Sequence, residues 1–230
     1  MHFKSLTALV LFFISFNVVA QTKSDSLPKR DLKFNVELGL SANSYRGSLV
    51  QHYGSYTQSY HVGIRFSKKK LANGRVNFSY GNIEGQNSSF EYKDSKGNVI
   101  KTNNYFKTSI FSLAYELNIK VIERRKFVIQ AILGVGAMRF TPYDQFENNL
   151  INNQSTRAAG ETYSSTSLYL PLGLQFMYKL PQGYNIGMSA NVMNPLTDFL
   201  DNTSKYSAYT TSDNVLMLKL FVSTPISLKL

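Results

Sequence analysis

The 230-residue chain contains no cysteine, no tryptophan and only three histidines. Without cysteine, disulfide bonds and metal sites with thiolate ligands are excluded. Acidic residues are scarce as well, because 14 Asp and Glu oppose 25 Lys and Arg and leave a formal net charge of +11. A soluble nucleic-acid-binding protein could carry such a charge. The positions of the basic residues must therefore decide what the charge means.

Long apolar runs are missing after the first 20 residues. The one such run, Leu6 to Val19, follows Lys4 and ends at the small residues Val18-Val19-Ala20. A basic start, a short apolar run and a small-residue cleavage site are typical of a secretory signal peptide. We therefore expect a signal peptide over residues 1–20 and a polar periplasmic leader over residues 21–31. A membrane anchor is the alternative, but a spanning helix needs about 20 apolar residues.

The rest of the chain alternates between apolar and polar residues. Between Ser167 and Leu180 every even position is Leu, Phe or Tyr, whereas the odd positions include Ser, Gly, Gln and Lys. A period of two indicates a β-strand, and the length reaches the roughly 9–11 residues of a transmembrane strand. Similar alternation predicts eight strands, over residues 32–44, 57–67, 75–83, 105–120, 127–141, 167–180, 184–193 and 213–229.

The connections between these strands alternate between long and short. The short ones include Lys68 to Gly74, with an Asn-Gly pair typical of hairpin turns, and Pro181-Gln182-Gly183. We predict an all-β fold over residues 32–230: an eight-stranded antiparallel transmembrane β-barrel of the outer-membrane type, with short periplasmic turns and long external loops. A secreted soluble barrel or sandwich is the alternative. The Gly, Ser and Asn of the polar face suit a crowded barrel interior better.

In this topology the excess positive charge of the mature chain lies at the short-turn end, to which we also assign Arg75. We define the basic rim as the cations of two short turns, namely Lys68, Lys69, Lys70, Arg124, Arg125 and Lys126. The rim of a secreted barrel meets no nucleic acid, so that class of partner is excluded. Two interpretations remain: a collar on anionic lipid head groups, and a docking face for an acidic periplasmic partner.

Four charged residues fall on the polar face within the wall: Glu37, Arg65, Glu116 and Lys219. The interior of an eight-stranded barrel is just wide enough for side chains, and an isolated buried charge costs several kcal/mol. We therefore predict that these charges pair and fill the lumen. A gated ion path is the alternative.

Motifs for chemistry are sparse. No metal-ligand spacing, phosphate-binding loop or carboxylate pair stands out, so we expect no cofactor and no enzymatic activity. Some small outer-membrane barrels are lipid-modifying enzymes that use His, Ser and a carboxylate. The mature chain offers His52 in a predicted loop and His61 on the polar face of the second strand. A lipid-modifying enzyme and a small surface-binding or pore-forming barrel therefore remain alternatives.

Several stretches carry a family resemblance, namely residues 81–85 (GNIEG), 134–142 (GVGAMRFTP), 170–174 (LPLGL), 178–180 (YKL), 184–187 (YNIG) and 196–202 (LTDFLDN). Through them the chain resembles a family of small outer-membrane barrels of unknown function from Gram-negative bacteria, similar to the PorG-type barrel of the type IX secretion system. The resemblance implies a non-enzymatic barrel in the cell outer membrane. It also implies contact with a periplasmic lipoprotein of the secretion machinery.

Overall fold

The computed structural model describes residues 31–66, 71–89, 92–93, 99–100, 104–153, 165–203 and 213–229. The expected signal peptide and almost all of the leader lie outside these residues. Residues Lys33–Ser227 form one compact unit, which contains all but the outermost residues of the barrel.

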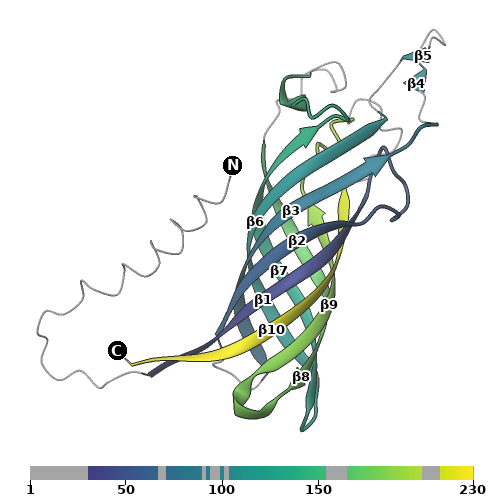
Figure 1. Cartoon of the computed structure of the whole chain (residues 1–230). Coiled ribbons are helices and arrows are strands. Elements are labelled where there is room, and N and C mark those ends of the chain that lie inside the picture. The colour runs from purple at the N-terminus through teal and green to yellow at the C-terminus, as the bar shows by residue number, and fades with distance from the viewer. Residues whose placement is uncertain are drawn as a thin grey trace, which may run out of the picture. The chain divides into compact units, whose positions relative to one another are not determined.

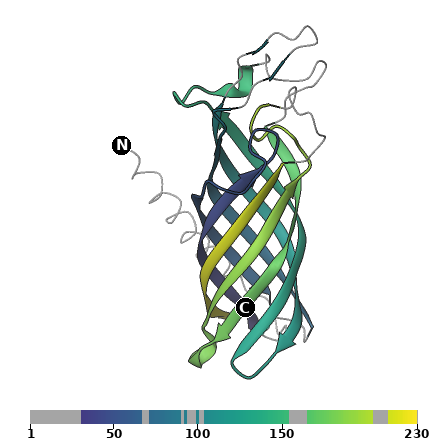
Figure 2. The same cartoon turned by 90° about the vertical axis from the view of Figure 1, so that its right-hand side faces the viewer.

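Eight strands form one closed barrel, which confirms the predicted fold (Figures 1 and 2). Around the barrel they follow the order β1-β10-β9-β8-β7-β6-β3-β2. Their bounds are β1 Asp31–Arg46, β2 Thr57–Phe66, β3 Ala72–Gln86, β6 Tyr105–Glu123, β7 Phe127–Tyr143, β8 Thr166–Lys179, β9 Asn185–Pro195 and β10 Asn214–Lys229. Closure matters because an open edge would leave unpaired backbone groups in hydrocarbon.

Small elements occupy the connections. Strands β4 (Tyr92–Lys93) and β5 (Val99–Ile100) pair as a separate two-stranded sheet between β3 and β6. The 3-10 turns η1 (Leu150–Asn152) and η3 (Pro181–Gly183) follow β7 and β8. None of the helices in the described part of the chain is long and apolar enough to cross a membrane.

The hairpin of β8 and β9 shows which face of the wall is outside. Leu168, Leu172 and Leu174 of β8 are more than half exposed, whereas the alternate residues Tyr169 and Gln175 are 2% and 1% exposed. The leucine row therefore covers the exterior, and the small or polar row lines the lumen, as the alternation predicted. Apolar side chains facing outward are favourable only where the surroundings are apolar, as in a lipid bilayer.

The predicted turn at Asn73-Gly74 is wrong, because both residues lie within β3 and pair with β6. The 19-residue strand β6 extends far enough to give β3 partners down to Ala72. Gly74 also has a packing role, since a Cβ there would lie 2.5 Å from the hydroxyl of Tyr115. An aromatic ring that covers a strand glycine in this way stabilises the pairing.

Candidate functional site

An ion-pair network crosses the middle of the lumen. Arg75 of β3 donates to Glu116 of β6 (Nε–Oε2 2.7 Å) and to Glu37 of β1 (Nη1–Oε2 3.0 Å). Arg65 of β2 forms a second ion pair with Glu37. All four side chains are at most 5% exposed. Four strands are thus connected through the interior by charge-assisted hydrogen bonds, which are stronger than neutral ones.

Glutamines continue the network across the barrel. Arg75 donates to Oε1 of Gln175 on β8 (2.6 Å), and Gln175 donates in turn to Gln130 on β7 (3.3 Å). Both glutamines are at most 1% exposed. Side chains from six strands, and Lys219 of β10 described below, therefore occupy the central lumen.

Two members of this layer differ from the sequence-based expectation. Arg75, which we assigned to the short-turn end, is fully buried at the centre of the network, because β3 begins at Ala72 rather than at residue 75. Lys219 lies inside the barrel at 4% exposure but forms no ion pair among the described residues. Its Nζ lies 5.5 Å from the ring centroid of Phe221, at cation–π distance.

A polar belt lies next to the ionic layer, toward the loop end. His61 of β2 and Ser41 of β1 are within hydrogen-bond distance (Nε2–Oγ 2.7 Å), and Ser41 also donates to Asn43 (2.7 Å). The other imidazole nitrogen, Nδ1, has no hydrogen-bond partner among the described residues. A catalytic Ser–His pair is normally oriented by a carboxylate at this nitrogen. His52, the other candidate, is exposed in the loop after β1.

The loop end of the lumen is filled by an apolar plug. We define the plug as the buried cluster of Tyr45, Leu49, Ile83, Phe106, Ile110, Ala114, Met138, Phe140, Tyr169, Met193, Leu200, Val215 and Met217. Most of these residues belong to strands, but Leu49 and Leu200 come from the loops after β1 and β9, and both are completely buried. Two of the long connections thus fold back into the barrel mouth.

Sequence reasoning missed the plug, although a signal for it exists. In β6 the inward face changes from Glu116 and Ser112 near its middle to Ile110 and Phe106 near its loop end. In β7 the inward residues near the loop end, Met138 and Phe140, are likewise apolar. An interior that becomes apolar toward one end requires a covering apolar group, which the loops supply.

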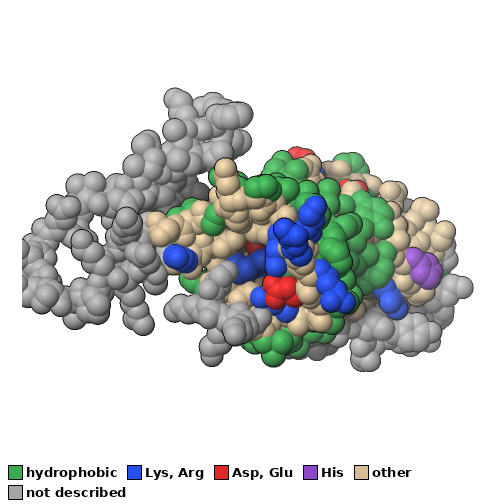
Figure 3. Space-filling view, turned by 90° about the horizontal axis from the view of Figure 1, so that it is seen from below, with side chains coloured by type: hydrophobic (Ala, Val, Ile, Leu, Met, Phe, Trp, Pro, Cys, Tyr) green, Lys and Arg blue, Asp and Glu red, His purple; other side chains and the backbone are tan. Residues whose placement is uncertain are grey.

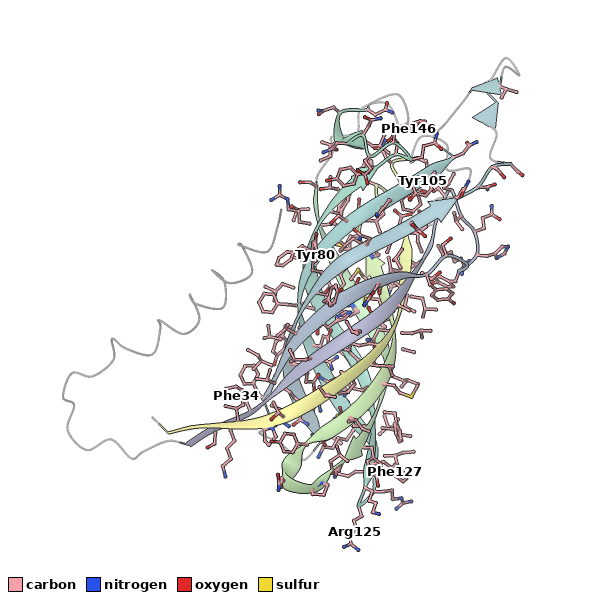
Figure 4. The ribbon with its side chains drawn as sticks, in the orientation of Figure 1. Phe34, Tyr80, Tyr105, Arg125, Phe127 and Phe146 are labelled. Carbon is pink, nitrogen blue, oxygen red and sulfur yellow. The ribbon has the colours of Figure 1, made fainter. Side chains whose placement is uncertain are left out.

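Cations gather at the opposite end of the barrel, the end from which Figure 3 is viewed. Arg124, Arg125 and Lys126 form the exposed turn between β6 and β7, and Arg125 is labelled at this end in Figure 4. Glu123 beside them is paired with Lys179 (2.7 Å) and Lys120 (3.0 Å). The three turn cations form no ion pair among the described residues. The remaining members of the basic rim, Lys68 to Lys70, lie outside the described residues.

A polar recess of about 350 Å³ lies at the loop end. It is lined by Asn82, Tyr105, Lys107, Tyr143, Asp144, Gln145 and Glu147. Tyr105 and the neighbouring Phe146 are labelled at this end in Figure 4. Asp144 stabilises the recess by accepting from the backbone N–H groups of Phe146 and Asn148 (both 2.8 Å). Partial burial acts to raise the pKa of Asp144, but the hydrogen bonds from Asn148 and Phe146 together hold it below its usual value.

Metal-binding groups are not assembled in the described part of the chain. No three His, Asp or Glu side chains there lie close enough to hold an ion together.

Solved structures with a similar fold include NspA, the neisserial surface protein A, with 9% identity over 83% of this chain and 96% of that one, at a TM-score of 0.52. A major outer membrane protein from Thermus thermophilus is 14% identical over 84% and 98% of the two chains (TM-score 0.49). Ail, the attachment invasion locus protein of Yersinia pestis, is 8% identical over the same shares (TM-score 0.48).

No protein-family model and no curated protein matches the sequence. At these identities the structural likeness concerns the fold alone, and it carries no information on type IX secretion. The closed eight-stranded barrel and its apolar exterior identify the chain as an outer-membrane protein whose wall contacts lipid.

Proposed function

We propose that the protein is a non-conducting outer-membrane barrel that works through its rims, and that its basic rim docks an acidic periplasmic partner. The observation that carries this proposal is the filled lumen. Buried ion pairs occupy its middle and the apolar plug occupies its loop end. A lumen filled in this way is expected not to conduct, so we assign the function to the exposed ends of the barrel.

The charge of the short-turn end favours an acidic partner. Arg124, Arg125 and Lys126 are exposed and unpaired among the described residues, and the nearby Glu123 is neutralised by two lysines. Unpaired surface charge of one sign steers partners of opposite charge and speeds their association. The side on which short turns lie in outer-membrane barrels is the periplasm.

The finer version of this proposal is an accessory role in the type IX secretion system, with a periplasmic lipoprotein as the partner. Its support is the resemblance of the Gly-rich strand motifs to PorG-type barrels. The competing interpretation of the same charge is a collar that rests on anionic lipid head groups.

The test compares two variants that remove the same kind of charge from opposite ends. In the first, Arg124 and Arg125 are both replaced by Ser; in the control, Arg46 and Arg139, both exposed near the loop end, are replaced by Ser. Each is expressed in the native host, cross-linked in intact cells and purified for mass spectrometry. We expect an acidic lipoprotein to be captured by the wild type and the control and lost, at least tenfold, from the first variant.

Two outcomes would overturn the docking proposal. One is equal capture of the lipoprotein by both variants. The other is that the rim substitutions leave protein partners unchanged but weaken retention of anionic phospholipid in the purified barrel, which would establish the lipid collar. In planar bilayers the pure protein is expected to give no sustained current, and a stable ohmic conductance would contradict the filled lumen.

The polar recess favours a second candidate function, recognition of a ligand at the cell surface. Its volume of about 350 Å³ is within the range of small-molecule sites. The side chains of Lys107, Gln145 and Glu147 have no hydrogen-bond or ion-pair partner among the described residues. Together with two tyrosine rings, these donors and acceptors suit a saccharide, which presents both hydroxyl groups and apolar ring faces.

This candidate is tested with lipopolysaccharide core oligosaccharide as the probe. Calorimetric titration should show binding that is weakened at least tenfold by Tyr143→Ala. Tyr56→Ala is the matched control, because Tyr56 is an exposed tyrosine of another loop. Absence of binding to the wild type, or equal binding by the two variants, would remove the recess as a saccharide site.

A further inference from the structure

A hydrogen-bonded group of one tyrosine and two aspartates lies within the plug. The hydroxyl of Tyr45, near the end of β1, is 2.8 Å from Oδ2 of Asp201 and 2.5 Å from Oδ1 of Asp213. Tyr45 is 1% exposed, and both aspartates are completely buried. Asp201 belongs to the loop after β9, and Asp213 directly precedes β10. We call these three residues the latch.

Backbone N–H groups occupy the remaining carboxylate positions. Asp201 accepts from Leu49 (3.0 Å) and Thr203 (2.9 Å), and Asp213 accepts from Leu200 (2.9 Å). The latch therefore connects the two loop segments that carry Leu49 and Leu200 to the ends of β1 and β10. Every carboxylate oxygen of the latch has a hydrogen-bond partner. The hydroxyl of Tyr45 is the one group that contacts both carboxyl groups.

No cation balances the two carboxyl groups among the described residues. Neither aspartate forms an ion pair with a described Lys or Arg. Within the described ranges, the other groups that face the latch are neutral, as with Thr108 of β6, which donates to the backbone oxygen of Leu200, or acidic, as with Asp198 of the same loop. Two uncompensated negative charges would be costly in this surrounding.

The latch needs a bound proton to make both of its short contacts favourable. A phenol has one proton and can donate it to only one carboxylate. The second short contact is favourable only if the other carboxyl group is protonated and donates to the phenol oxygen. Burial raises the pKa of Asp213 well above its usual value, and the neighbouring charge of Asp201 raises it further. Burial also raises the pKa of Asp201, although its hydrogen bonds oppose this effect.

We propose that the two aspartates of the latch share one bound proton through Tyr45, and that loss of this proton releases the loop plug from the barrel mouth. With the proton bound, Leu49 and Leu200 are held in the lumen by their own N–H groups. Without it, two adjacent carboxylates repel each other, and solvation of both requires the loops to move outward. Because protonation stabilises the closed plug, the plug is closed at low pH and opens as the pH rises through the titration of the latch.

Gly47 packs directly against the latch, with no room for a side chain. A Cβ at this position would overlap the hydroxyl of Tyr45 and Oδ1 of Asp213. Its backbone N–H donates to the oxygen of Val50 (2.8 Å), which shapes the turn that carries Leu49. Gly47→Ala should therefore displace the latch at every pH.

The experiment is hydrogen–deuterium exchange of the full chain in phospholipid vesicles, from about pH 5 to about pH 10, a range that starts above the ordinary carboxyl pKa. Rates are divided by the intrinsic chemical rate at each pH, which gives a protection factor for each amide. The informative amides are those of Leu49, Leu200 and Thr203, since they donate to the latch. Amides of the paired strands β8 and β9 serve as the internal reference.

We expect protection of the three latch amides to fall at least tenfold with rising pH, while the reference amides stay constant. Asp213→Asn keeps an acceptor for Leu200 and a donor for Tyr45 without a titrating proton, so its protection should be independent of pH. Gly47→Ala should show low protection throughout. Wild-type protection that is constant or uniformly low, or an Asp213→Asn variant that retains the pH dependence, would overturn the proposal, and the wild-type series decides it even if a variant fails to fold.

Discussion

The two halves of the lumen are filled by different physical means. Near the middle, strand residues alone supply the ion pairs of Glu37, Arg65, Arg75 and Glu116. At the loop end, Leu49 and Leu200 of two long connections enter the barrel and complete an apolar cluster. The first filling is fixed by strand register and disappears only when the barrel unfolds. If the latch releases the plug as proposed, the second filling opens while the wall stays intact, so substitutions in the two halves should differ in what they destabilise.

The largest effect is expected from Arg75→Met in the ionic half. Its removal leaves the carboxylates of Glu37 and Glu116 buried with one cation fewer, and breaking a buried ion pair costs about 3–5 kcal/mol. The free energy of unfolding from lipid vesicles in urea measures it. Arg125→Met is the matched control, because an exposed rim arginine should change stability by less than about 0.5 kcal/mol. Equal losses would mean that the network contributes nothing beyond surface charge.

The next effect concerns the wall that encloses both halves. Leu174→Arg places a charge on a lipid-facing side chain that is 59% exposed in the middle of β8. Arginine near the bilayer midplane costs about 2–4 kcal/mol, whereas near the interface it costs about 0–1 kcal/mol. Leu180→Arg, at the short-turn end of the same row, is therefore the control. If both variants fold in lipid as the wild type does, the assignment of the leucine row to the exterior is wrong.

Leu200→Ala should weaken the plug without unfolding the barrel. Truncating a completely buried leucine costs about 2–5 kcal/mol, and here the cost should appear as opening of the loop segments. Protection of the Thr203 amide should fall, while that of β8 stays unchanged. Leu196→Ala is the control, since Leu196 is 65% exposed. A uniform loss of protection over all strands would show that the plug and the wall unfold as one unit.

The smallest effect is expected from Lys219→Met in the ionic half. Lys219 is buried without an ion pair among the described residues, so replacing it with an apolar side chain of similar length removes a desolvated charge and loses only the cation–π contact with Phe221. Unfolding in urea should give a stability equal to or slightly above that of the wild type. A loss of stability comparable to that of Arg75→Met would instead show that the charge of Lys219 stabilises the ion-pair network.

Sequence alternation was sufficient to predict the barrel, because a period of two with an apolar row of membrane-spanning length leaves few other folds. It placed Glu37, Arg65 and Glu116 in the lumen for the same reason. It failed at Arg75, since the Asn73-Gly74 pair was interpreted as a turn and the ladder of β3 with β6 overrides that local preference. The latch was out of reach, because Tyr45 lies 156 residues from Asp201 and 168 from Asp213, and only folding of the loops brings the three together.

One seam of the barrel has a consequence for how the chain folds. Most neighbouring strands are joined by one connection, but β1 and β10 pair although they lie at opposite ends of the chain. Contacts between distant segments form slowly, because a long loop must first be closed. Glu37, Arg65, Arg75 and Glu116 belong to β1, β2, β3 and β6, all on one side of this seam. We therefore expect β1, β2, β3 and β6 to pair first, with their ion pairs formed. Pairing of β10 with β1 should then be the slowest step of barrel assembly.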